Sequence, residues 1–143
     1  MTLKPVAVVR KVFGVLLVLW AGSLWSLAAW VAPTLFYAQA DRHLAGVLAA
    51  RLFDIETYVG IAVALLASLL PGRAKYRWAY LAAALLAVNE WVLKPVLTRA
   101  HAGAVAGLSF GAWHGISAVL YLTACAAVLL LVWRQSALDP RNT

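Results

Sequence analysis

The chain has 143 residues, of which 65% are hydrophobic and 12% are charged, whereas an ordinary soluble domain is roughly 45–50% apolar. A soluble protein of this size is mostly surface, so the composition excludes a soluble globular domain. The net charge of +7 does not indicate nucleic-acid binding, because the basic residues flank apolar segments and form no patch with interleaved aromatic residues. We therefore expect the lipid bilayer to surround most of the chain.

Four apolar segments predict four membrane-spanning helices, because each is close to the length of about 20 residues that a span needs. The first follows a basic start but is longer than the apolar core of a signal peptide, typically ~7–15 residues, so we expect a retained span. The second ends at Pro71-Gly72, a pair that breaks helices. The sequence predicts one all-α, four-helix transmembrane domain over residues 1–143, with no evident internal repeat and with spans at about 13–36, 50–70, 76–97 and 110–133.

The distribution of basic residues predicts the orientation of these spans. One side of the membrane would carry eight of them, namely Lys4, Arg10, Lys11, Arg73, Lys75, Arg77, Arg134 and Arg141. The other side would carry four, Arg42, Arg51, Lys94 and Arg99, together with Asp41, Asp54, Glu56 and Glu90. Because the side richer in Lys and Arg stays in the cytoplasm, we expect a protein of the cell's inner membrane with both termini cytoplasmic.

Polar residues gather toward the outer ends of the predicted spans. The candidates for a ligand or proton site are His114, Glu90, Asp54, Arg51, Lys94, Ser117 and Asn89. Ionisable groups in the hydrocarbon region are costly unless paired or hydrated, so such groups usually face the interior of a bundle. Two hypotheses remain open: a site that binds a ligand or a proton, or a structural ion-pair network in which Arg51 pairs with Asp54 or Glu56, and Glu90 pairs with Lys94 four residues later.

Metal and haem binding are predicted only weakly by the residue pattern. His114 with Glu90 is the best pair for a metal ion, but neither His-x-x-x-His nor Glu-x-x-His occurs. One axial histidine can hold a haem, so haem stays open. His43 and His101 lie in predicted loops, and Cys125 is alone in the last span, where we expect a core residue.

Glycine recurs every fourth residue ahead of and into the last span, at Gly103, Gly107, Gly111 and Gly115. Small residues at this spacing give a helix a smooth face that another backbone can approach closely. The pattern predicts a helix-packing stripe, on which another helix of the bundle, a flat ligand, a membrane protein partner or a second copy of the chain would lie. Ala83 and Ala87 in the third predicted span offer a similar, shorter groove.

Three stretches resemble a known family. They are Ala32-Pro33-Thr34-Leu35-Phe36, Leu52-Phe53 and Phe110-Gly-Ala-Trp-His114-Gly-Ile-Ser117, to which Asn89 and Pro95 are added. Together they resemble the transmembrane protein 205-like family, a group of small DUF4149-type four-helix membrane proteins of unassigned function. The resemblance implies the same fold and functional weight on Pro33, Phe36, His114 and Ser117. Relatives often carry Asn at the position of Tyr121.

Three functions follow as hypotheses. The first is a non-enzymatic accessory, assembly or interaction subunit of a membrane complex. The second is a membrane protein that binds or transports a metal ion, haem or small cation through the outer polar cluster, and it requires Glu90, His114 and Asp54 to converge. The third is a haem oxidoreductase, which requires an axial histidine facing a porphyrin-sized cleft.

Overall fold

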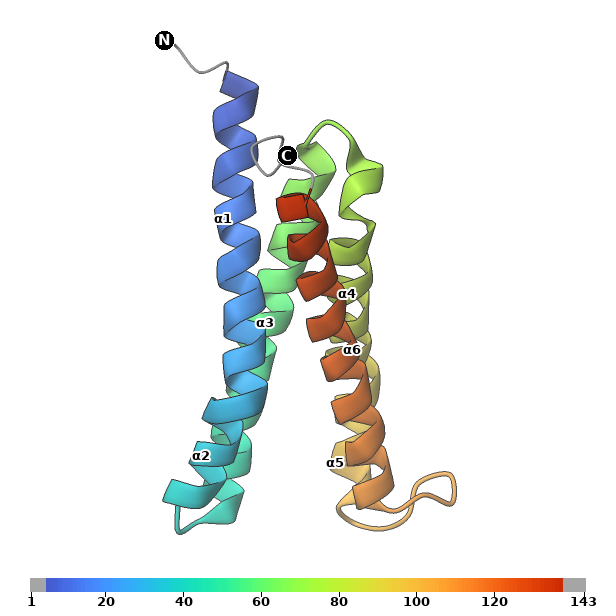
Figure 1. Cartoon of the computed structure of the whole chain (residues 1–143). Helices are drawn as coiled ribbons and strands as arrows, with labels where there is room; N and C mark the ends of the chain where they lie inside the picture. The colour runs from blue at the N-terminus through green and yellow to red at the C-terminus, as the bar shows by residue number, and fades with distance from the viewer. Residues whose placement is uncertain (1–4, 138–143) are drawn as a thin grey trace.

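The computed structural model describes residues 5–137, and four helical paths run through them side by side (Figure 1). The first path consists of α1 (Pro5–Ser26), η1 (Leu27–Val31) and α2 (Ala32–Ala38). The second is the single helix α3 (Arg42–Leu69). The third consists of η2 (Arg73–Tyr76), α4 (Arg77–Val88), η3 (Asn89–Leu93) and α5 (Lys94–Ala100), and the fourth is α6 (Phe110–Ala137).

All four paths are long and apolar enough to cross a membrane, over Val8–Ala38, Arg42–Leu69, Arg73–Ala100 and Phe110–Ser136. The described residues contain no β-strand, and the predicted all-α membrane bundle of four helices is confirmed. Helix α1 begins and α6 ends at one end of the bundle, which we call the terminal end. The opposite end, which holds the α2–α3 turn and the α5–α6 loop, is the notch end (Figure 1).

Local sequence explains where the second path begins. The Asp41 side chain accepts hydrogen bonds from the backbone N–H groups of His43 at 2.8 Å and Leu44 at 3.2 Å. Such an N-cap satisfies donors that have no partner inside the helix. Helix α3 therefore starts at Arg42, whereas apolarity alone predicts a span from about residue 50.

Two of the paths bend at a proline that follows a π-helical turn. Pro33 and Pro95 lie in the first turn of α2 and α5, directly after η1 and η3. Proline has no N–H to donate and its ring clashes with the preceding turn. The wider π-helical turn accommodates the proline ring, so the helix continues past it. Such turns often occur at functional sites.

The four paths form a closed ring around one core. Helix α1 contacts α3, α3 contacts α4, α4 contacts α6, and α6 contacts α1. The interior is filled mainly by aliphatic side chains, of which Leu17, Leu24, Leu86 and Leu131 are almost completely buried. At the notch end α2 packs on α3 and α5 packs on α6, so the four helices continue as two separate pairs.

The two halves of the chain have the same architecture. Each half contains a helix, a five-residue π-helix, a seven-residue helix with proline in its first turn, and a 28-residue helix. Residues 27–38 correspond to residues 89–100, and residues 42–69 correspond to residues 110–137. The structure therefore contains an internal repeat that the sequence does not reveal.

Burial follows the same repeat. In the bent helices the buried positions Leu17, Trp20, Ala21 and Leu24 correspond to the buried positions Ala79, Ala82, Ala83 and Leu86. In the straight helices the buried positions Glu56, Thr57, Gly60 and Val63 correspond to Ala124, Cys125, Val128 and Leu131. The equivalent rings of Phe53 and Tyr121 meet edge to face, with centroids 4.7 Å apart.

The repeat is hidden because equivalent positions carry side chains of different size. Trp20 packs against Gly60, where an added Cβ would lie 2.9 Å from the indole ring. The equivalent positions in the second half are Ala82 and Val128, so the small residue there lies on the bent helix. The interior volume is divided differently in the two halves, so these equivalent positions differ in residue type.

Candidate functional site

A lysine bridges two carboxylates where the two halves of the molecule meet. Lys94, at the start of α5, donates hydrogen bonds to Asp54 on α3 and to Glu90 on η3, the latter at 2.6 Å. The side chain of Lys94 is 40% exposed, and those of Asp54 and Glu90 are 16% and 15% exposed. The predicted pair of Glu90 with Lys94 is therefore present. We call these three residues the ion triad.

The predicted pairing of Asp54 with Arg51 is wrong. Arg51 makes no ion pair in the part of the chain that the structure describes, although it is close enough to interact electrostatically with Asp54. Lys94 pairs with Asp54 instead, because the contact of α3 with η3 brings the lysine close to the Asp54 carboxylate across the interface between the two halves. The ion triad thus joins the two halves, whereas the predicted pair lay within one helix.

Glu56 does not join the ion triad. Two residues after Asp54, it lies on nearly the opposite side of α3 and accepts a hydrogen bond from Ser23 Oγ of α1 at 3.3 Å. Glu56 is 9% exposed. The expected pairing of Glu56 with Arg51 is therefore wrong as well, and helical spacing alone is sufficient to separate Glu56 from Asp54.

A second polar pair connects η3 with α6. Ser117 Oγ donates to Asn89 Oδ1 at 2.6 Å, and Asn89 Nδ2 donates to the carbonyl of Ser117 at 3.2 Å. Both side chains thereby satisfy each other inside the membrane region, where an unpaired polar group is costly. Asn89 and Ser117 therefore serve to hold helices together in this conformation.

His114 is apart from these polar contacts. Its ring stacks on Phe110 with centroids 5.8 Å apart, and His101 lies against the same Phe110 at 4.0 Å. Within residues 5–137, His114 shares no hydrogen bond or ion pair with Glu90, and no group of three His, Cys, Asp or Glu residues is placed to hold a metal ion. Asp54 and Glu90 converge on Lys94, and His114 does not join them.

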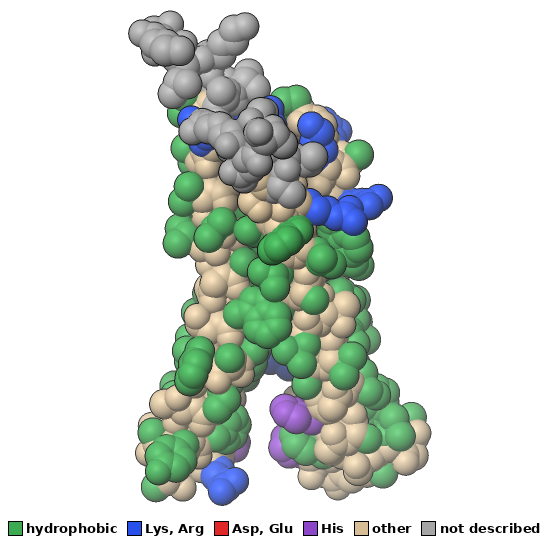
Figure 2. All heavy atoms as spheres, in the orientation of Figure 1, with side chains coloured by type: hydrophobic (Ala, Val, Ile, Leu, Met, Phe, Trp, Pro, Cys, Tyr) green, Lys and Arg blue, Asp and Glu red, His purple; other side chains and the backbone are tan. Residues whose placement is uncertain are grey.

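The molecule is hollowed at the notch end. Figure 2 shows an open notch between the pair α2 with the start of α3 and the pair α5 with the start of α6. Histidine side chains lie on its wall (Figure 2). The notch therefore exposes polar side chains within the length of the membrane-spanning helices.

The predicted glycine stripe is wrong as one helical face. Helix α6 begins at Phe110, so Gly103 and Gly107 lie in the preceding loop, where Gly107 has φ of 77° in a tight turn closed by Val105 and Leu108. No side chain lies within 4 Å of a Cβ added at Gly103, Gly107 or Gly115. Trp113 Nε1 donates to the carbonyl of Val105 at 3.0 Å and holds this loop on α6. Glycine here permits a turn instead of close helix packing.

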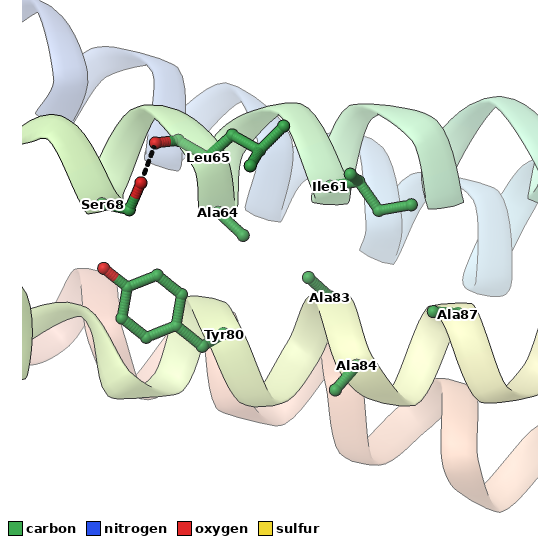
Figure 3. A pocket seen from close by; sticks show the side chains of 8 residues that line it. All are labelled: Ile61, Ala64, Leu65, Ser68, Tyr80, Ala83, Ala84 and Ala87. Atoms are coloured by element: carbon green, nitrogen blue, oxygen red, sulfur yellow. Dashed lines mark hydrogen bonds between the residues drawn. The ribbon is translucent and has the colours of Figure 1, made fainter.

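A shallow apolar groove of about 340 Å³ lies between α3 and α4 (Figure 3). Four of the side chains that line it are alanines, Ala64, Ala83, Ala84 and Ala87, and the others are Ile61, Leu65, Ser68 and Tyr80. Ser68 Oγ donates to the carbonyl of Leu65 at 2.6 Å, so this hydroxyl is satisfied by its own helix. Alanines one turn apart on α4 form the smooth face that was expected of the glycines. The four-residue spacing of Ala83 and Ala87 in the sequence indicates this smooth face.

Comparison with known proteins identifies one family. The family model described as "Domain of unknown function (DUF4149)" matches residues 15–93 of the chain. This segment runs from α1 to the end of η3 and includes Asp54, Glu56 and Glu90. It ends before Lys94 and before the Phe110–Ser117 stretch that resembles the transmembrane protein 205-like family. No curated protein and no solved structure matches the chain.

Proposed function

Because the chain belongs to the DUF4149 family of membrane proteins, whose description assigns no activity, we propose a function from its own geometry. The protein is a non-enzymatic interaction subunit that binds a transmembrane helix of a partner membrane protein in the groove between α3 and α4. The alanine-lined groove is the observation that carries this proposal. In lipid, helices associate through close packing of small residues and not through the hydrophobic effect.

The shape and lining of the groove support a helix as its occupant. Ala84 is exposed and Ala87 is half-buried, while Ala83, one turn from Ala87, is buried at the base of the groove. A partner backbone can therefore approach α4 over Ala84 and Ala87. The lining is almost entirely apolar. An apolar helix with small residues of its own fits such a surface better than a charged or polar ligand does.

The polar cluster consists of the ion triad and the Asn89–Ser117 pair, and its hydrogen bonds support a structural role. Each of these side chains has a partner inside the protein. A catalytic group in its place would need a free acid, base or nucleophile next to a substrate cavity. We therefore propose that the cluster fixes the relative position of the two halves, and with it the width of the notch.

Charge supports an inner-membrane location with both termini in the cytoplasm. The start of α1, the turn from α3 into α4 and the end of α6 lie at the terminal end (Figure 1), and in the described part they carry Arg10, Lys11, Arg73, Lys75, Arg77 and Arg134. Lys4 and Arg141, which enter the same count, lie outside the described residues. The half of the bundle toward the notch end carries Arg42, Arg51, Lys94 and Arg99 with Asp41, Asp54 and Glu90, and Glu56 lies near the midpoint of α3. The excess of positive charge is therefore at the terminal end.

Photo-cross-linking in native membranes tests the groove. A photoreactive amino acid replaces Leu65, which lines the groove and is 63% exposed. The matched control replaces Leu129 on α6, which is 49% exposed. We expect a protein adduct of defined mass from position 65 alone, and its loss when Ala84→Leu fills the groove. Ala126→Leu, on an exposed face of α6, controls for the added side chain.

Three outcomes separate the alternatives in this experiment. An adduct of twice the chain's mass would identify a second copy as the occupant. An equal yield from positions 65 and 129 would indicate random collision in the bilayer. If position 65 reacts with lipid only, the interaction proposal fails.

A second candidate function is binding of haem or a metal ion at the notch. The pair of histidines around Phe110 favours it, because His101 and His114 lie at the end where Figure 2 shows histidine side chains on the wall of the notch. Its test is the visible absorption spectrum and metal content of the purified protein beside those of His114→Ala. A Soret band or a stoichiometric metal that disappears in the variant supports it, and a colourless, metal-free protein rejects it.

A further inference from the structure

Glu56 is a buried acidic side chain with no basic partner among the described residues. It is the fifteenth residue of the 28-residue helix α3, which places it about 20 Å from either end at a rise of ~1.5 Å per residue. The residue is 9% exposed. Its carboxyl group therefore lies near the midpoint of a helix that is long enough to span the membrane, inside the bundle.

The other two acids of this region are arranged differently. Asp54 and Glu90 share the ammonium group of Lys94. Among the described residues, Glu56 has one hydrogen-bond partner, the hydroxyl of Ser23. An ionised carboxylate in the hydrocarbon core is very costly unless a cation pairs with it, so this environment favours the neutral acid.

The groups that face the Glu56 carboxyl come from two neighbouring helices, α1 and α6. From α1, Ser23 Oγ contacts it at 3.3 Å and also donates to the carbonyl of Trp20 at 2.9 Å. From α6, Tyr121 and Cys125 are near enough to interact electrostatically with it. The titratable groups contributed by η3 and α5, Glu90 and Lys94, are engaged with Asp54. None of the facing groups supplies a positive charge to Glu56.

Packing does not require a carboxyl at this position. The internal repeat places Ala124 at the equivalent position of α6, and Ala124 is completely buried. The first half has a glutamate where the second half uses a methyl group. The equivalent position of the second half is therefore closed without a polar group.

We propose that Glu56 is a proton-binding site in the middle of the membrane, formed by its carboxyl group with Ser23 Oγ. In the conformation described, the site holds one proton and the carboxyl group is neutral. Release of that proton requires water or a cation to reach Glu56, so protonation is coupled to closure of the bundle around it. This inference is independent of the helix-binding function proposed for the α3–α4 groove.

Dicyclohexylcarbodiimide tests the proposal, because it adds to protonated carboxylic acids in apolar surroundings. The full-length protein in liposomes is treated across a pH series and its peptides are analysed by mass spectrometry. We expect one reagent molecule on Glu56, with a yield that falls as pH rises. The matched controls Glu90→Gln and Asp54→Asn keep the modification, and Glu56→Gln loses it.

Infrared difference spectroscopy provides a second readout that does not depend on access of the reagent. We expect a carboxylic acid C=O band that shifts in D2O and is absent from Glu56→Gln. In Ser23→Ala the band should remain but move, because its hydrogen-bond partner is gone. Circular dichroism confirms that each variant keeps its helices.

Three results would overturn the proposal. The first is modification that persists unchanged in Glu56→Gln. The second is a wild-type spectrum without a band that depends on Glu56, which would mean that the group is ionised. The third is protection of Glu56 from the reagent by excess NaCl at constant pH, which would assign the site to Na⁺ instead of a proton.

Discussion

Replacement of Lys94 by methionine removes the one cation of the ion triad while keeping the length of its side chain. Two carboxylates, each about 15% exposed, then face each other without a counter-charge. Loss of one partner from a fully buried ion pair costs roughly 3–5 kcal/mol, and an exposed pair contributes roughly 0–1 kcal/mol. Because Lys94 is 40% exposed, we expect Lys94→Met to lower the free energy of unfolding by about 2 kcal/mol, between these limits.

Reversible unfolding in mixed detergent micelles, followed by tryptophan fluorescence, measures this loss. The control combines Lys94→Met with Asp54→Asn and Glu90→Gln, which removes all three charges and should recover most of the stability. Arg51→Met, which breaks no ion pair in the described region, should have a smaller effect than Lys94→Met. A Lys94→Met protein as stable as the wild type would refute the idea that the ion triad joins the two halves.

Three further variants test the packing by the same unfolding assay. Gly60→Ala places a Cβ 2.9 Å from the Trp20 ring and should cost about 1–3 kcal/mol; Gly22→Ala, with nothing within 4 Å, is its control and should not destabilise. Tyr121→Phe removes a hydrogen bond of 3.1 Å to a backbone carbonyl of α1 and should cost about 1 kcal/mol, so an unchanged stability would mean that water replaces the hydroxyl. Gly107→Ala forces an alanine to φ of 77° and should cost about 1 kcal/mol; a neutral result would show that the α5–α6 loop relaxes.

The sequence was sufficient to predict the four helices and the Glu90–Lys94 pair. Runs without charge indicate spans because a bilayer tolerates few charges, and helical spacing brings residues four apart into contact. It was not sufficient to pair Asp54 with Lys94, because that contact depends on how two bent helices meet. The same limit explains why the predicted glycine stripe is wrong. Periodicity alone does not distinguish a helix from the loop that precedes it, in which Gly107 has a positive φ.

Sequence also did not separate Glu56 from its neighbours. It was expected to be one of several outer acids, and its importance becomes visible only when the partners of Asp54 and Glu90 are known. The α3–α4 groove was predicted in part, because Ala83 and Ala87 have the spacing of a smooth face. Its other wall, Ala64 with Ile61 and Leu65, depends on the tertiary packing of α3 against α4.

The equivalence of residues 15–69 and 77–137 has a consequence for how such a chain could be built. Each unit crosses the membrane twice and returns the chain to the side from which it started, so a second copy is inserted in the same direction as the first. A unit with an odd number of crossings would have required its copy to be inserted upside down, with opposite loop charges. Two copies of one hairpin joined head to tail would therefore give this topology with all loops on their original sides.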